Sequence, residues 1–325
     1  MSARGFFRVV LWCALCCGAL NGVGAELPPP DEKRIAADEA AGIKFSADKR
    51  TLVKYAPKPR EEEYVVPDGV TAVGDSAFAR CPNLVAVKFP ASVKRIGNCA
   101  FYECGDLVRV DLPEGIAAVG SWTFEGCGKL AEVSIPASVK IIGYGAFARC
   151  ESLKRLALPE GLLEIRDSAF AGCEHLDLVI PSTVRKIGSG AFWKCYALRG
   201  VEIPEGVTEI GRLTFYACLS LTAVNIPGSV KTIGEEAFQQ CENLRSVNVN
   251  AGVTFIGPGA FSLCRKLAAA ALPPTLTSIG RGAFSHCEKL EKIAIPASVK
   301  TIGKGAFKKC PCEETVAKQR PDYRK

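Results

Sequence analysis

Residues 135–150 read IPASVKIIGYGAFARC, and variants of this stretch recur along most of the 325-residue chain. Its phenylalanine returns every 23 residues, with one step of 22, and a cysteine follows each phenylalanine by three residues. A proline has the same period from Pro67 to Pro296, and Asn250 is the one substitution in that column. Such a fixed period is typical of stacked structural repeats. The phenylalanines are Phe78, Phe101, Phe124, Phe147, Phe170, Phe192, Phe215, Phe238, Phe261, Phe284 and Phe307.

Each part of the repeat predicts a local structure. Val87 and Phe89 flank Lys88, and this alternation predicts a short strand. Pro90 ends the strand because it has no N–H for the ladder, and Gly97 breaks the chain at a corner, where a positive φ would suit glycine. The apolar residues that follow have helical spacing and predict one helical turn with its apolar side inward: Ala100, Phe101, Cys104 and Leu107.

A single unit of this kind cannot bury its own apolar face, so the units must stack into a continuous core. Eleven turns at an inter-strand spacing of ~4.8 Å predict a rod on the order of 50 Å long. The sequence therefore predicts an α/β repeat fold, a solenoid of parallel short strands with one helical turn per 23-residue repeat.

The repeat resembles the BspA-like, or Treponema pallidum-type, leucine-rich-repeat family. The resemblance covers about Tyr64 to Cys310, and residues 45–55 (FSADKRTLVKY) resemble the longer opening units of that family. It implies an exported protein linked to adhesion to host proteins or to other cells, although a likeness of fold does not identify a ligand. The matching residues are, for example, Ile135 to Lys140, Ile142, Gly143, Ala146, Phe147 and Cys150.

The first 25 residues have the form of a secretory signal. Arg4 and Arg8 precede an apolar run, and Val23 and Ala25 provide small residues at a cleavage site. The run is short for a bilayer, so a membrane anchor is the alternative interpretation rather than the expected one. A lipid attached to one of the cysteines in the run, such as Cys17, would anchor the N-terminus.

The remaining segments complete the predicted domain boundaries. Residues 26–42 are rich in proline, charge and alanine, and we expect a linker with a short helix near residues 31–41. Residues 43–64 form a modified first turn that caps the solenoid, residues 65–310 form its eleven turns, and residues 311–325 form a charged, frayed tail.

The sixteen cysteines suggest disulfides in an exported protein, but their positions argue otherwise. Three lie in the signal, and eleven occupy one stacked column, where neighbouring side chains point the same way and keep their Cβ atoms too far apart for a disulfide. A linear column also does not converge on a metal. We therefore expect buried apolar thiols, with Cys99 and the Cys310–Cys312 pair as the candidates for redox activity.

We find no sequence motif for catalysis and predict no enzyme, no cofactor and no metal. The two histidines, His175 and His286, fall in turns and are expected to be solvated. The formal net charge is +7, and removal of residues 1–25, which hold two arginines and no acid, would leave +5. This weak positive charge does not predict nucleic-acid binding without a clustered basic stripe.

Binding residues are sought instead among the exposed columns. The strand face has mostly small side chains and could be a simple solvated surface or a flat docking strip; its candidate partner-binding residues are Arg109, Arg155, Glu202, Asn225 and Asn248. A sharper candidate follows the 22-residue step, where Trp193 and Tyr216 are 23 residues apart and Tyr196 lies between them. Solvent-facing Trp and Tyr are typical interface anchors, but local packing or self-association are alternatives.

A third column carries basic residues in alternate repeats, and their wide spacing favours solubility over the tracking of phosphates. Heparin-like polyanions are a weaker alternative ligand for this column. Its residues are Lys94, Lys140, Arg185, Lys231 and Lys300.

Together these features predict an exported, adhesion-type scaffold that recognises a host, matrix or cell-surface protein. The alternative is a periplasmic structural or scaffolding protein that binds another envelope component, and a thiol-dependent redox protein is a third class. The location is the periplasm or the cell surface, with membrane contact only through an N-terminal lipid. The oligomeric state is open.

Overall fold

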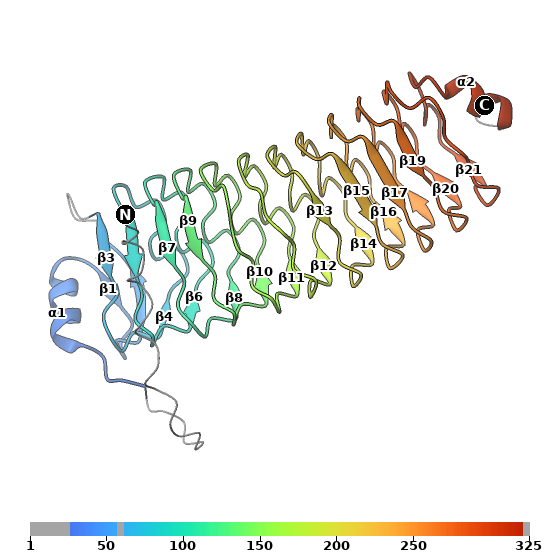
Figure 1. Cartoon of the computed structure of the whole chain (residues 1–325). Helices are drawn as coiled ribbons and strands as arrows, with labels where there is room; N and C mark the ends of the chain where they lie inside the picture. Colours follow the sequence, from blue (N-terminus) through green and yellow to red (C-terminus); the bar gives the residue numbers. More distant parts are fainter. Residues whose placement is uncertain (1–26, 57–61, 321–325) are drawn as a thin grey trace, which may run out of the picture.

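The structure is a computed structural model that describes residues 27–56 and 62–320. The predicted signal and its lipidation site lie outside these residues. The described chain winds into an elongated solenoid, with helix α1 (Glu32–Ala40) at one end and helix α2 (Glu313–Gln319) at the other (Figure 1). The predicted solenoid is confirmed, with about eleven turns and parallel strands.

A first row of strands comes from the segment before each proline. Equivalent residues of successive turns pair in parallel, as Val87 does with Val110. The row is divided into two sheets: β3 (Glu63–Val65), β5 (Ala86–Lys88), β7 (Arg109–Asp111) and β9 (Glu132–Ser134), then β13 (Val201–Glu202), β15 (Ala223–Ile226), β17 (Ser246–Val249) and β19 (Ala269–Ala271).

The first row is interrupted where the repeat loses a residue. Between β9 and β13, the pairing in this row is reduced, within the described residues, to an isolated bridge between Arg155 of the fifth turn and Asp177 of the sixth. The 22-residue step removes one residue from the strand segment before Pro181. The alternation of buried and exposed side chains in this segment therefore cannot stay in register with the segments of the neighbouring turns. Leu178 and Ile180 remain buried, whereas Val179 between them is 75% exposed.

A second row of short strands comes from the segment before Gly97 and the equivalent positions of other turns. These strands also pair in parallel, except at the start of the row. There, β1 and β2 form an antiparallel hairpin, and β2 continues the row by pairing with β4. The strands are β1 (Lys44–Phe45), β2 (Thr51–Lys54), β4 (Ala72–Val73), β6 (Arg95–Ile96), β8 (Ala118–Val119), β10 (Ile141–Ile142), β11 (Glu164–Ile165), β12 (Lys186–Ile187), β14 (Glu209–Ile210), β16 (Thr232–Ile233), β18 (Phe255–Ile256), β20 (Ser278–Ile279) and β21 (Thr301–Ile302).

The helical turn expected around each phenylalanine is not confirmed. The segment is a series of tight turns, such as the one closed by the Cys104 N–H donating to the Phe101 carbonyl at 3.1 Å. Residues two before and two after the phenylalanine have positive φ, for example Trp122 at 53° and Gly126 at 75°. A left-handed residue reverses the curvature of the chain, so two of them in each repeat prevent a helix from propagating.

The phenylalanine column forms the centre of the core. Rings of successive turns stack nearly parallel, from 4.9 Å between Phe78 and Phe101 to 5.5 Å between Phe284 and Phe307. These side chains are fully buried. Each ring covers the apolar faces of its two neighbours, which a single repeat could not do alone.

The cysteine column satisfies backbone acceptors inside this core. All thirteen cysteines in the described residues are free thiols. From Cys104 onward, each column thiol donates to the carbonyl of the phenylalanine one turn earlier, as Cys127 does to Phe101 at 3.1 Å. That carbonyl also accepts the Cys104 N–H, so both of its lone pairs are used. The prediction of buried, apolar thiols is confirmed for this column.

Both ends of the solenoid are covered by helices. The segment 26–42, expected to be a linker, carries α1, and Ile35 of this helix is buried in the core. Buried Asp38 accepts a hydrogen bond of 2.7 Å from the hydroxyl of Tyr64. The segment therefore packs on the solenoid, because its first turn would otherwise leave an apolar face in water.

The prediction of a frayed tail after Cys310 is wrong for the residues that the structure describes. Helix α2 buries Val316, and Cys312 before it is also buried. Arg320 donates from its guanidinium to the Val299 carbonyl at 2.7 Å. The few apolar residues in this charged segment are sufficient to cover the last turn of the core.

Candidate functional site

Trp193 and Tyr216 form a stacked pair on the turn side of the solenoid. Their ring centroids are 6.2 Å apart with an interplanar angle of 17°, and both side chains are partly exposed. Lys194 Nζ lies 4.3 Å from the centroid of the Trp193 ring, a cation–π distance. Tyr196 is partly exposed one position after Cys195. The aromatic side chains are thus available to a partner.

A second aromatic group, not singled out in the sequence, lies nearer the N-terminus on the same side of the repeat. Trp122 is 45% exposed and Tyr144 is 41% exposed. The Trp122 ring covers Gly145, where an added Cβ would come within 2.7 Å of Trp122 Cδ1. Tyr102 occupies the same repeat position as Trp193, with Arg80 5.6 Å from its ring centroid. That shared position was the signal by which Tyr102 could have been found.

The strand-face candidates in the first half of the solenoid are the charged residues Arg109 and Arg155, and Arg109 is paired with carboxylates. Arg109 is exposed on β7 and lies 2.9 Å from Asp111 and 3.6 Å from Glu132. Arg155 is exposed beside a pocket of about 440 Å³ that these residues also line. The ion pairs neutralise Arg109, and the lining as a whole, with Lys154 and Arg155, keeps an excess of one positive charge.

The candidates in the second half form part of an amide row. Glu202, Asn225 and Asn248 are exposed on β13, β15 and β17. The Asn248 amide donates to Asn225 Oδ1 and to Asn250 Oδ1, both at 2.8 Å. These residues lie in the first strand row, whereas Trp193 and Tyr216 lie in the turns, so the predicted residues occupy two sides of the solenoid.

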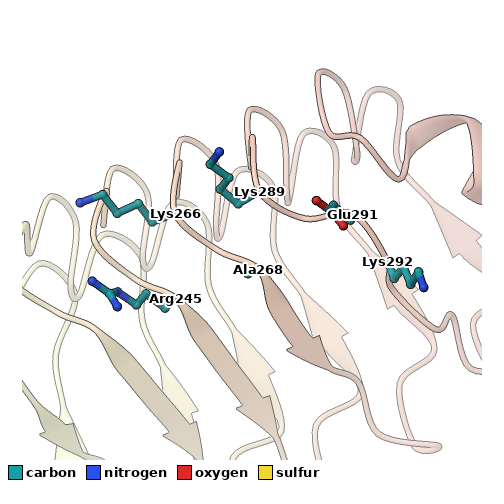
Figure 2. Close-up of a pocket in the computed structure, with 6 residues that line it drawn as sticks. All are labelled: Arg245, Lys266, Ala268, Lys289, Glu291 and Lys292. Carbon is teal, nitrogen blue, oxygen red and sulfur yellow. The ribbon is translucent and has the colours of Figure 1, made fainter.

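A basic pocket of about 500 Å³ lies on the loops beside β17 and β19 and was missed in the sequence (Figure 2). Its charges come from three successive turns, so no short motif could reveal them. A count over residues 261–310 gives a signal, since this stretch holds nine Lys or Arg against two Glu. The lining residues are Arg245, Lys266, Ala268, Lys289, Glu291 and Lys292.

The candidate reactive groups outside the cysteine column are the two histidines, Cys99 and Cys312. His175 is exposed, with its Nδ1 3.0 Å from the Glu151 carbonyl oxygen, and His286 is partly exposed in a turn. Burial raises the pKa of the Cys99 thiol, and a hydrogen bond to Cys310 together with burial raises the pKa of Cys312. A raised pKa disfavours the thiolate, which is the reactive form of a cysteine. Within residues 27–56 and 62–320, no cluster of side chains could hold a metal ion.

The geometry defines a class of protein, a leucine-rich-repeat scaffold with open side surfaces built from stacked turns. The chain belongs to the family of the BspA type leucine rich repeat region, whose model matches residues 71–199 and 185–314. Proteins of this family are typically non-enzymatic scaffolds that interact with other proteins. No helix in the described part of the chain is long and apolar enough to span a membrane.

Solved structures show the same fold. A leucine-rich repeat protein from Bacteroides ovatus is 24% identical, with a TM-score of 0.53 over 82% of this chain and 90% of that chain. A leucine rich cell surface protein from Faecalibacterium prausnitzii is 25% identical, with a TM-score of 0.53 over 82% and 83% of the two chains. The pneumococcal vaccine antigen PcpA is 21% identical, with a TM-score of 0.51 over 83% and 68%. No curated protein matches the chain.

Proposed function

We propose that this chain is an exported, adhesion-type scaffold that binds a host, matrix or cell-surface protein through exposed aromatic residues on its turn side. The stacked Trp193–Tyr216 pair is the observation that carries the proposal. Large, rigid aromatic side chains supply much contact area at low entropic cost, which is why Trp and Tyr dominate protein interfaces. Tyr196 beside the pair extends the same surface.

The aromatic group around Trp122 supports the same use of this side. Trp122 has a φ of 53°, in a column that elsewhere holds mostly small residues. The left-handed backbone is common to this position in every turn, but a large exposed indole is not, and exposed aromatic side chains are typical of interfaces. A partner that spans several turns could contact both aromatic groups.

Export supports this role and is part of the proposal. Residues 1–25 have the features of a signal, and the similar Faecalibacterium protein is described as a cell surface protein. Protease treatment of intact cells, with determination of the mature N-terminus, tests location. Digestion of the solenoid supports a surface adhesin. Protection with an N-terminus at Glu26 would instead favour the periplasmic scaffold that binds another envelope component.

The binding test uses the purified mature chain and immobilised matrix proteins. The double substitution Trp193→Ala/Tyr216→Ala should weaken binding at least roughly tenfold, because two anchors at ≥ 1 kcal/mol each are removed. Phe255→Ala is the matched control, since Phe255 is 37% exposed but lies on β18 in the second strand row. Equal losses in both variants, or no loss in the double variant, would reject the aromatic surface.

A further inference from the structure

The basic pocket of Figure 2 lies where the first strand row stops. In the preceding turn, the Ala268 N–H donates to the Arg245 carbonyl at 2.9 Å and begins the pairing of β19 with β17. One turn later, the Glu291 N–H donates to the Lys289 carbonyl at 3.0 Å instead. The described residues 291–296 form no strand, so the surface opens between the two turns.

The positive charges of this pocket are hardly neutralised by carboxylates of the same chain. Within the described residues, no ion pair involves Arg245, Lys266, Lys289 or Lys292, and the Lys266 ammonium donates to Asn243 Oδ1 at 2.7 Å. Glu242 and Glu288, in the neighbouring loops, both pair with Arg265 instead. Glu291 is the single carboxylate in the lining, so the pocket keeps a clear positive excess.

The pocket beside β9 provides an internal comparison. It also lies where the first strand row is interrupted, and it has a similar volume of about 440 Å³. It holds three cations, Arg109, Lys154 and Arg155, against two carboxylates, Asp111 and Glu132, which both pair with Arg109. The formal excess there is one positive charge, against three in the C-terminal pocket, where four cations face one carboxylate. The excess at the C-terminal end comes from the sequence of residues 261–310.

The shape of the surroundings restricts the ligand. Ala268 lines the pocket and β19 continues it with alanine side chains, so no apolar hollow among the lining residues could seat a peptide side chain. No aromatic residue lines it, which leaves nucleobases without a stacking platform. Lys266 and Lys289 extend from consecutive loops, with Arg245 one turn earlier (Figure 2). The cations thus follow the solenoid axis and suit an extended, evenly charged chain.

We propose that the pocket lined by Arg245, Lys266, Lys289 and Lys292 binds a linear sulfated polysaccharide along the solenoid axis. Sulfate oxygens accept charge-assisted hydrogen bonds from lysine and arginine, and the flat alanine surface lets the sugar chain lie across successive turns. This site is independent of the aromatic surface and adds a second class of ligand to the protein-binding role.

The test is calorimetric titration of the mature chain with a heparin dodecasaccharide, poly-L-glutamate and desulfated heparin at physiological salt. Lys266→Gln/Lys289→Gln should weaken heparin binding roughly fivefold to tenfold, as expected for two exposed ion contacts. Lys304→Gln/Lys308→Gln is the matched control, because it removes the same charge from exposed lysines in the last turn, outside the pocket. It should leave heparin binding within twofold of the parent.

Several outcomes would overturn the proposal. These are an equal loss in the control variant, poly-L-glutamate bound as tightly as heparin, or no heparin binding by the parent. Retained binding after desulfation would point to the sugar rather than the sulfates and would also reject it. Trp193→Ala/Tyr216→Ala should not change heparin affinity, so failure of this proposal and failure of the aromatic surface are separable.

Discussion

At the scale of single residues, the phenylalanine column should dominate stability. Phe215 is fully buried, with ring centroids 5.5 Å from Phe192 and 5.1 Å from Phe238. Phe215→Ala would remove the contacts on both sides and leave a cavity that stacked turns cannot close, so we expect a loss of about 4 kcal/mol in the free energy of unfolding. The midpoint of urea unfolding, followed by circular dichroism, measures it.

Phe255→Ala serves as the control, because this ring is already 37% exposed and its removal should cost less than ~1 kcal/mol. Similar losses for both variants would contradict a core that depends on the stacked column. The 23-residue period predicts which residues of the phenylalanine column point into the core. The period does not predict which residues adopt a left-handed backbone. Glycine is the residue that indicates a positive φ in a sequence, yet Trp122, Leu213 and Glu236 also adopt one.

At the scale of elements, helix α2 should hold the last turn closed. Val316 is its buried residue and lies against the end of the core. Val316→Asp would place a carboxylate there, so we expect α2 to detach and the last turns to open locally, at a cost of about 2–3 kcal/mol. Hydrogen exchange should become faster around Phe307, while amides near Phe170 keep their protection.

Lys318→Ala is the control for α2, because Lys318 is exposed and lies in the same helix. A Val316→Asp chain with parent-like exchange near Phe307 would show that α2 is not a cap. The charge of residues 311–325 and the absence of the repeat predict a tail, because a single valine gives little sign of a buried helix face. The repeat also predicts a first-row strand in every turn, yet the register fails at the shortened segment before Pro181, and residues 291–296 of the last turn form no strand.

At the scale of the whole molecule, sequence alone predicted the solenoid well and its surfaces only in part. Every repeat has the same pattern of strand, turn and core residues, so the structure of one unit predicts the fold of the whole solenoid. A binding surface depends on the columns that repeats build together. The stacked pair of Trp193 and Tyr216 could be found because its members share one repeat position. The basic pocket was missed although Lys266 and Lys289 also share one repeat position, because Arg245 and Lys292 lie at other positions and the opening itself depends on a strand that does not form.

The cysteine column makes a further prediction about the whole molecule, its stability at alkaline pH. Burial raises the pKa of Cys173 and Cys241 to about 12 in the folded chain. In the unfolded chain, the pKa of a cysteine thiol is ~8.5. Above that pH the unfolded state loses protons that the folded state keeps, so stability is fully present below pH ~8.5 and falls as pH rises toward 12. Each such thiol should remove about 1.4 kcal/mol per pH unit in this window.

Urea midpoints measured from pH 7 to 10 test this dependence. The double variant Cys173→Ala/Cys241→Ala should show a shallower fall than the parent, by about the contribution of two thiols. Cys99→Ala should change the slope less, because Cys99 lies outside the column and is only partly buried. Lysine and tyrosine titrations are common to all three chains, so the difference in slope isolates the thiols. An unchanged slope in the double variant would mean that the column thiols do not couple folding to pH.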